Sequence, residues 1–327
     1  MANPPGTSRC VDAFGTRIHL VEHGEGPVVL LVHGFPESWY SWRHQLGPLA
    51  EAGYRAVAID VRGYGRSAKP HDVAAYGMLA HVGDNVGVLD ALGVEHATVV
   101  GHDWGSPIAA NSALLRPDRF RAVALLSVPY APRGDRRPSE VYPTMVGPDE
   151  EFYIAYFQEP GRAEAEIEAD VRTWLLGFYV GAAAAAPRPP DGRSIAAVRR
   201  GGRLRDAFGV PDTLPDWLGP ADLDFYVGEF ERSGFRGPLN RYRNVDRDFD
   251  DLTAWRKAPI AVPSLFVGGD QDGPTVWGAH AIGRFPETMP GLVGSHVLPD
   301  CGHWVQQEQP ERVTDLLLAF LAEVAPT

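Results

Sequence analysis

One aspartate lies between two glycines in a pattern that could carry out nucleophilic chemistry. The segment Gly101-His102-Asp103-Trp104-Gly105 follows the apolar run Thr98–Val100. A glycine two residues before and two residues after a reactive residue is typical of a nucleophile elbow, a sharp strand–turn–helix in which small residues let the strand and helix approach closely. We therefore predict that Asp103 is a nucleophile rather than only a cap for the following helix.

An aspartate in this position predicts a particular class of reaction. A carboxylate is ionised at neutral pH, so it needs no base to become nucleophilic. The start of the following helix also favours a negative charge beside it. Attack of Asp103 on an sp³ carbon forms an alkyl ester, which activated water must then hydrolyse. The pattern indicates opening of an epoxide or displacement of a halide, and not hydrolysis of peptides or ordinary esters.

Hydrolysis of such an ester requires a base and an acid that orients it, and both are present late in the chain. His303, in Cys301-Gly302-His303-Trp304, is the candidate base. The loop Gly268-Gly269-Asp270-Gln271-Asp272 offers two aspartates as the acid. We favour Asp272 over Asp270 because its offset from the preceding apolar run fits better. The chain order nucleophile, acid, histidine is that of hydrolases with an elbow on a parallel sheet.

Short apolar runs predict the sheet that must position these residues. Each run ends at turn residues, and the early runs are separated by 20–40 residues with helical patterns, which favours a parallel sheet covered by helices on both faces. The runs are Val28–Val32, Ala56–Ile59, Thr98–Val100, Ala122–Leu126, Ser264–Val267 and Ser295–Leu298. Apolar residues at helical spacing from Glu311 to Val324 predict a closing helix.

The strand pattern is missing from the middle of the chain. Residues 131–256 hold helical segments such as Glu164–Tyr179, and Pro/Gly-rich pieces separate them. The alanine- and proline-rich stretch Gly181–Gly192 is typical of a mobile connector. We therefore predict an α/β fold with a discontinuous core, residues 1–130 and 257–327, and an inserted, mostly helical cap at 131–256.

Composition excludes several other classes of protein. The chain has 327 residues, 44% of them hydrophobic, and a formal net charge of −12, which disfavours binding to nucleic acid. Cys10 and Cys301 are the only cysteines, too few for a disulfide framework. No signal-peptide pattern, apolar membrane span or metal-binding motif is visible, so we expect a cytoplasmic protein without cofactor or metal.

Five motifs in the same order make the chain resemble the epoxide hydrolases of the α/β-hydrolase fold, both the soluble animal type and the bacterial type. They extend over nearly the whole chain. The motifs are His33-Gly34-Phe35-Pro36-Glu37-Ser38-Trp39-Tyr40-Ser41-Trp42, Gly63-Tyr64-Gly65-Arg66-Ser67, the aspartate elbow, Tyr153-Ile154-Ala155-Tyr156-Phe157-Gln158-Glu159-Pro160-Gly161 and Gly302-His303-Trp304.

The resemblance implies roles for specific residues. It makes Asp103 the nucleophile, Asp272 the orienting acid and His303 the base that activates water. It also implies an oxyanion hole formed by the backbone N–H groups of Phe35 and Trp104, with a cis peptide bond between Phe35 and Pro36.

The same resemblance implies that two cap tyrosines, Tyr153 and Tyr242, hold the epoxide oxygen, since the alkoxide formed on ring opening needs hydrogen bonds or a proton. Tyr156 competes with Tyr153 for this role. The chain departs from the family pattern at Arg241, where tryptophan is common, and at Ser106, where glycine is common. These departures bear on the shape of the substrate.

The function predicted from the sequence is conversion of an apolar epoxide and water into a vicinal diol through an ester on Asp103. The nearest alternative is a haloalkane dehalogenase, which uses the same nucleophile but needs no proton donor for its leaving halide. A second alternative is a binding protein on the same fold that has lost catalysis. A homodimer is compatible with the sequence.

Overall fold

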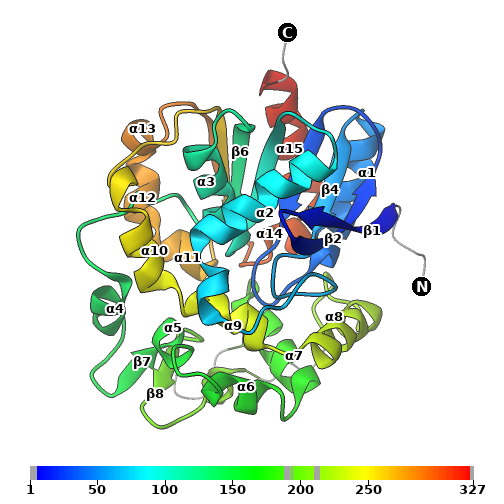
Figure 1. The fold of residues 1–327 in the computed structure, drawn as a ribbon. Helices are drawn as coiled ribbons and strands as arrows, with labels where there is room; N and C mark the ends of the chain where they lie inside the picture. The colour runs from blue at the N-terminus through cyan, green and yellow to red at the C-terminus, as the bar shows by residue number, and fades with distance from the viewer. Residues whose placement is uncertain (1–5, 188–191, 193, 210–213, 325–327) are drawn as a thin grey trace.

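The computed structural model describes residues 6–187, 192, 194–209 and 214–324, and an eight-stranded sheet forms its centre. The strand order is β1-β2-β4-β3-β5-β6-β9-β10. The two N-terminal strands pair antiparallel, β2 is antiparallel to β4, and every other neighbouring pair is parallel. Helices flank this sheet (Figure 1), so the predicted α/β fold with a mostly parallel sheet is confirmed. The strands are β1 (Thr7–Ala13), β2 (Thr16–His23), β3 (Val28–Val32), β4 (Arg55–Ile59), β5 (Ala97–His102), β6 (Phe120–Leu126), β9 (Ser264–Gly269) and β10 (Leu292–Leu298).

Apolar side chains on both faces of the parallel strands explain why the predicted runs were continuous. All five residues of β3 are buried. Val28, Leu30 and Val32 join one hydrophobic cluster, together with residues of α2 and α3. Val29 and Leu31 join the other, with residues of α1 and α15. Successive side chains of a strand point to opposite faces, so a strand covered on both sides must be apolar throughout.

The helices of the core are α1 (Arg43–Glu51), α2 (Met78–Ala91), α3 (Gly105–Leu115), α11 (Gly273–Trp277), α12 (Ala279–Gly283), α13 (Phe285–Thr288), α14 (Val305–Glu308) and α15 (Pro310–Val324). The predicted closing helix is α15, which buries Val313, Leu317, Phe320 and Leu321 against the sheet. None of the described helices is both long and apolar enough to cross a membrane.

The N-terminal hairpin was not predicted. β1 and β2 pair over their full length around a turn at Phe14 and Gly15, both of which have positive φ. β1 alternates between exposed and buried residues near its end and carries several polar side chains. It is an edge strand, so it lacks the continuous apolar run by which the central strands were recognised.

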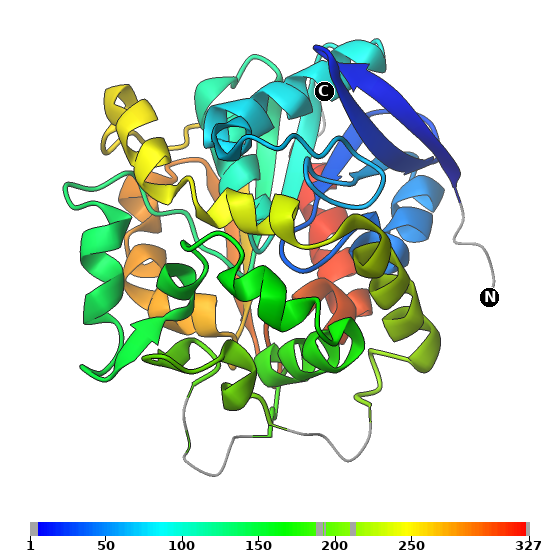
Figure 2. The ribbon, with the colours of Figure 1, turned by 60° about the horizontal axis from the view of Figure 1, so that its bottom comes forward.

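The segment between β6 and β9 lies over the carboxyl end of the sheet, and Figure 2 brings it to the front, in green to yellow. It is mostly helical, as predicted, but also contains a two-stranded antiparallel sheet. Its elements are α4 (Pro138–Val141), β7 (Glu150–Phe152), α5 (Tyr153–Tyr156), α6 (Arg162–Ile167), α7 (Val171–Ala182), β8 (Ala197–Arg199), α8 (Pro220–Ser233), α9 (Arg236–Tyr242) and α10 (Val245–Asp251). The division into a core and a cap at 131–256 remains our proposal.

The helical stretch predicted at Glu164–Tyr179 is two helices, α6 and α7. The side chain of Asp170 accepts a hydrogen bond from the Thr173 N–H and so caps the start of α7. The predicted connector Gly181–Gly192 begins in the last residues of α7. Residues 188–191 of that connector lie outside the described residues.

Candidate active site

Asp103 lies in the sharp turn between β5 and α3, at the carboxyl end of the sheet. Its φ of 51° is in the left-handed region, which is uncommon for a residue other than glycine. Gly105 lets α3 approach β3, because a Cβ on that residue would lie 1.9 Å from the Val32 carbonyl oxygen. The turn therefore presents the Asp103 carboxylate at the end of the sheet, where it is 8% exposed.

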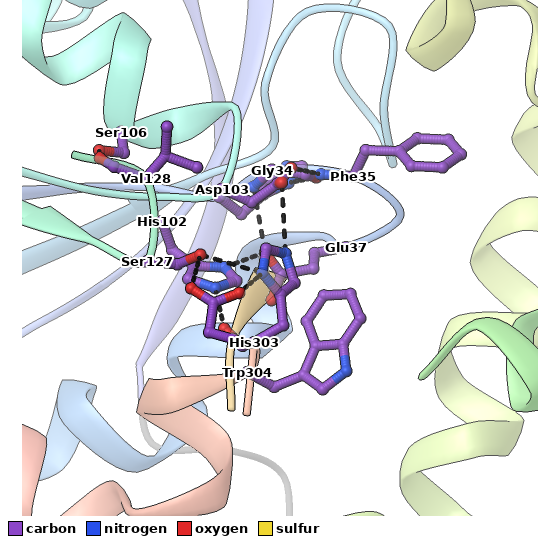
Figure 3. A network of polar contacts seen from close by, with 12 residues as sticks. Gly34, Phe35, Glu37, His102, Asp103, Ser106, Ser127, Val128, His303 and Trp304 are labelled. Atoms are coloured by element: carbon purple, nitrogen blue, oxygen red, sulfur yellow. Dashed lines mark hydrogen bonds and ion pairs between the residues drawn. The ribbon is translucent and has the colours of Figure 1, made fainter. Parts of the chain in front are cut away.

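Asp103, His303 and Asp272 form a continuous line of polar contacts, of which Figure 3 labels Asp103 and His303. The Nε2 atom of His303 lies 3.3 Å from Oδ2 of Asp103. On the opposite side of the ring, Nδ1 of His303 lies 2.9 Å from Oδ1 of Asp272. Asp272 is completely buried and follows β9 closely, whereas Asp270 is exposed and its Oδ1 accepts from the Cys301 N–H at 3.2 Å. The structure thus places Asp272, and not Asp270, against the histidine.

Two hydroxyl groups hold the other oxygen of Asp272. Ser127 Oγ and Thr275 Oγ1 each donate to Oδ2 of Asp272 at 2.7 Å. Ser127 Oγ also lies 2.9 Å from Nδ1 of His303. Ser127 directly follows β6 and has a φ of 70°. Sequence analysis did not identify it, although its place just after a buried strand, at the same edge as the elbow, was a usable signal.

Opposite charges set the protonation of Asp103 and His303. Burial by itself raises the pKa of Asp103, but the hydrogen bond and charge of His303 outweigh it and hold that pKa below its usual value. Burial likewise lowers the pKa of His303, yet the two carboxylates of Asp272 and Asp103 raise it well above 6.5. In the free protein Asp103 is therefore ionised and His303 is its cationic neighbour.

One backbone N–H group donates to the Asp103 carboxylate, and a second lies close by. The Phe35 N–H donates to Oδ1 of Asp103 at 2.7 Å, and the peptide bond between Phe35 and Pro36 is cis, as expected. Gly34 allows this close approach. A Cβ on Gly34 would lie 2.2 Å from Oδ1 of Asp103 and 2.6 Å from the Trp104 nitrogen, so both N–H groups border the same small space.

Two tyrosines from the segment above the sheet face the same cavity as Asp103. The rings of Tyr153 and Tyr242 are 6.1 Å apart, at an interplanar angle of 75°. Burial, together with the charge of Asp103, raises the pKa of both hydroxyl groups well above the usual value, so both hold their protons. Tyr156 is directed elsewhere, since its hydroxyl donates to the buried Glu166.

A second buried pair, Glu37 and His102, lies close to Asp103 and His303 (Figure 3). Nδ1 of His102 is 2.7 Å from Oε2 of Glu37, and Nε2 of His102 is 2.7 Å from the His303 carbonyl oxygen. Both acceptors lack a proton, because the charge of His102 outweighs burial and lowers the pKa of Glu37. The Glu37 carboxylate is therefore ionised.

The same pair connects three loops of the site. Oε2 of Glu37 also accepts from the Gly34 N–H at 3.1 Å, so Glu37 joins the Phe35 loop to the elbow and, through His102, to the His303 loop. Both residues lie within motifs of the sequence, but no local pattern predicts a role for them, because their contact joins positions that are 65 residues apart.

The cavity at Asp103 has a volume of about 750 Å³, and aromatic rings and small residues line it together with polar groups. Its lining includes Phe35, Phe178, Tyr153, Tyr242, Ala182, Ala183, Ala186, Ala196, Ala207, Asp270 and Trp277. Within the described parts of the chain, no group of three or more His, Cys, Asp or Glu side chains is placed to hold a metal ion.

Comparison with known proteins identifies the family. The model of the α/β hydrolase fold family matches residues 27–310. Epoxide hydrolase B of Mycobacterium tuberculosis is 47% identical, over 97% of this chain and 99% of its own length. Epoxide hydrolase A of the same organism is 43% identical, over 96% of this chain and 97% of its own length.

Solved structures agree with these relatives. An epoxide hydrolase from an endophytic Streptomyces superposes with a TM-score of 0.95 and 62% identity, over 98% of this chain and 97% of that one. Epoxide hydrolase A from Mycobacterium thermoresistibile gives a TM-score of 0.90 and 42% identity, over 97% of this chain and 98% of that one. The chain described here therefore belongs to the epoxide hydrolases of the α/β-hydrolase fold.

Proposed function

We propose that the protein converts an apolar epoxide and water into a vicinal diol, with Asp103 as nucleophile, His303 as base, Asp272 as orienting acid, and Tyr153 and Tyr242 as donors to the epoxide oxygen. The observation that carries this proposal is the placement of an ionised carboxylate and two protonated tyrosines around one cavity. The ionised carboxylate can attack a carbon of the epoxide, and the protonated tyrosines can donate to its oxygen.

Ring opening is the first step of the proposed reaction. An oxygen of Asp103 attacks one epoxide carbon, the bond from that carbon to the ring oxygen breaks, and an alkyl ester forms. The electron pair of the broken bond stays on the oxygen, where the hydroxyl groups of Tyr153 and Tyr242 stabilise it and one of them supplies a proton. A leaving halide needs no proton donor, whereas this site offers the hydroxyl groups of two tyrosines. We therefore favour an epoxide over a haloalkane as the substrate.

Ester hydrolysis is the second step. Once Asp103 is esterified its negative charge is lost, which removes one of the two carboxylates that raise the pKa of His303. His303 gives its proton to the tyrosinate left by ring opening and becomes neutral. Held by Asp272, it then takes a proton from water as that water attacks the carbonyl carbon of the ester. The Phe35 and Trp104 N–H groups stabilise the oxyanion. As the oxyanion collapses, its carbon–oxygen double bond is restored and the bond from that carbon to the diol oxygen breaks. The diol oxygen takes the remaining proton of the attacking water, so the diol leaves and the Asp103 carboxylate is restored.

Trapping the ester tests this assignment. Wild-type protein, Asp103→Ala and His303→Gln are incubated with styrene oxide and followed by diol formation and intact mass. We expect diol from the wild type, neither diol nor adduct from Asp103→Ala, and one adduct of substrate mass on His303→Gln, because alkylation needs no base. Diol formation by Asp103→Ala at the wild-type rate would exclude Asp103 as nucleophile, and halide release from bromoalkanes without diol would favour dehalogenation.

The cytoplasmic location and the homodimer remain part of this proposal. Cell fractionation tests the location, and light scattering coupled to size-exclusion chromatography tests the assembly, with a mass near 35.6 kDa excluding the homodimer.

A further inference from the structure

Arg241, the residue before Tyr242 in α9, carries a buried guanidinium group. Only 2% of the residue is exposed, which is rare for arginine unless the charge is paired. Its partner is Asp248 of α10, and it also donates to the Tyr76 carbonyl oxygen. Its Nε has no hydrogen-bond partner among the described residues. These contacts fix the guanidinium in one place, where α9 and α10 meet the core.

The guanidinium lies against the indole of the oxyanion-hole residue. The central carbon of the Arg241 guanidinium is 4.7 Å from the centre of the Trp104 ring, a geometry that attracts a cation to the aromatic face. The Trp104 ring also meets the Tyr242 ring edge to face, with centroids 5.1 Å apart. Two consecutive residues of α9 therefore hold the indole in position.

Trp104 and Tyr242 separate two cavities. Tyr242 lines the catalytic cavity of about 750 Å³, together with Asp103. Trp104 and Arg241 line a second cavity of about 300 Å³, whose other lining residues are largely apolar, including Met78, Leu114, Val245, Leu252 and Trp255. Because the two rings are in contact, the Trp104–Tyr242 pair is the wall between the cavities.

We propose that Arg241 is a specificity-determining residue that holds Trp104 in this wall and so keeps the catalytic cavity open on one side only. The inference rests on the proposed epoxide hydrolysis. With the wall closed, the epoxide carbon that faces Trp104 can carry hydrogen or a small group, while the substituent on the other carbon occupies the large cavity. The protein then prefers epoxides with bulk on one carbon over trans epoxides with a bulky group on each.

The substrates that test this are styrene oxide, with one phenyl group, and trans-stilbene oxide, with a phenyl group on each carbon. The measured quantity is the ratio of kcat/KM for trans-stilbene oxide to that for styrene oxide. The wild type should have a low ratio. Because both substrates undergo the same chemistry, a general loss of activity leaves the ratio unchanged.

The main variant is Arg241→Met/Asp248→Asn, which removes both charges and so leaves no unpaired ion in the interior. The asparagine side chain retains an oxygen that can accept from the Met78 N–H, as Asp248 does at 2.6 Å. We expect the ratio to rise about tenfold, in line with the discrimination that one apolar pocket contact provides. Arg241→Lys keeps the charge but has no planar group to cover the indole, so we expect a smaller rise, about threefold.

The matched control is Arg243→Met/Glu164→Gln. This variant removes another ion pair of the same segment, in which Nη1 of Arg243 lies 2.8 Å from Oε1 of Glu164. Arg243 is two residues further along the chain than Arg241. This pair contacts neither Trp104 nor Asp103 in any described interaction, so the ratio should remain at the wild-type value.

The outcomes separate this inference from the function on which it depends. A ratio that rises in the Arg241 variants and not in the control supports it. The inference is overturned if the Arg241 variants form diol from both epoxides with an unchanged ratio, or if the control shows the same rise. Either result leaves the proposed epoxide hydrolysis intact. If the double variant does not fold, Arg241→Lys decides by the same ratio. Absence of diol from either epoxide in the wild type overturns both proposals.

Discussion

At the scale of single residues, chemistry depends on groups whose protonation is set by their neighbours. Asp103 is ionised because cationic neighbours and N–H groups surround it, and Tyr153 and Tyr242 retain their protons because they are buried near that negative charge. A carboxylate and two phenols thus complement one another across a single cavity.

Removing one tyrosine hydroxyl should slow alkylation, and removing both should nearly abolish it. We expect Tyr153→Phe and Tyr242→Phe each to reduce the rate of ester formation about tenfold, because the remaining hydroxyl still donates, and the double variant to reduce it about 10³-fold. Single-turnover measurement in the His303→Gln background isolates this step. Tyr156→Phe is the control, since its hydroxyl bonds Glu166. An equal loss in the control would contradict the assignment.

The raised pKa of His303 predicts how stability depends on pH. The folded protein binds this proton more tightly than the unfolded chain, whose histidine has the ordinary value of 6.5. The stabilisation is therefore complete below about pH 6.5 and is lost as the pH rises through the folded pKa. Urea unfolding at about pH 6 and about pH 9 should show a larger difference between wild type and His303→Gln at the lower pH.

His81 provides a control of opposite sign for that measurement. Burial lowers its pKa well below 6.5, so the wild type should lose stability relative to His81→Leu as the pH falls through the unfolded value. If both differences were independent of pH, neither histidine would have the protonation described here.

At the scale of elements, the close approach of strands and helices decides where the catalytic groups lie. The elbow works because β5 turns directly into α3, and α3 in turn lies against the carbonyl end of β3. The glycines of this turn are therefore required for the position of Asp103. Glycines elsewhere in the helices, where a side chain has room, are not required in this way.

Gly105→Ala and Gly83→Ala should change stability in opposite directions. A Cβ on Gly105 would meet the Val32 carbonyl oxygen at 1.9 Å, so the helix must shift and the free energy of unfolding should fall by about 2 kcal/mol or more. Gly83, inside α2, has open space around the same position, and alanine should raise that free energy by about 0.5–1 kcal/mol. Equal effects in chemical denaturation would contradict this account of the elbow.

At the scale of the whole molecule, the segment between β6 and β9 and the sheet share one interior. Phe35 of the core packs against the rings of Trp174, Phe178 and Tyr242, with centroids 5.3–6.2 Å apart. The Tyr179 hydroxyl donates to the Pro36 carbonyl oxygen at 2.5 Å. The walls of the catalytic cavity are thus also the interface between the two parts.

Because of this shared interior, the protein should unfold in a single transition. Loss of the packing around Phe35 would expose apolar surface on both parts at once, so neither has a stable state without the other. Calorimetric and van't Hoff enthalpies should agree, and near- and far-ultraviolet circular dichroism should change together. Two separate transitions would show that the cap and core fold independently.

Much of this protein could be predicted from the sequence. The glycine spacing around Asp103 and the continuous apolar strands are local patterns, because a tight turn and a strand buried on both faces constrain the residues within them. The edge hairpin β1–β2 was not predicted, because an edge strand needs no such pattern. The helices α6 and α7 were predicted as one helical stretch, because the role of Asp170 as the N-cap residue of α7 was not recognised.

Only the tertiary structure decided which distant residues meet. It placed Asp272 rather than Asp270 against His303, and it brought Ser127, Glu37 and His102 to the loops of Asp103 and His303. It also set Arg241 against Trp104, which turned a departure from the family pattern into a hypothesis about the substrate. These contacts join positions far apart in the chain, so no local pattern carries them. The class of chemistry was present in the sequence, and the shape of the site depends on how its segments pack.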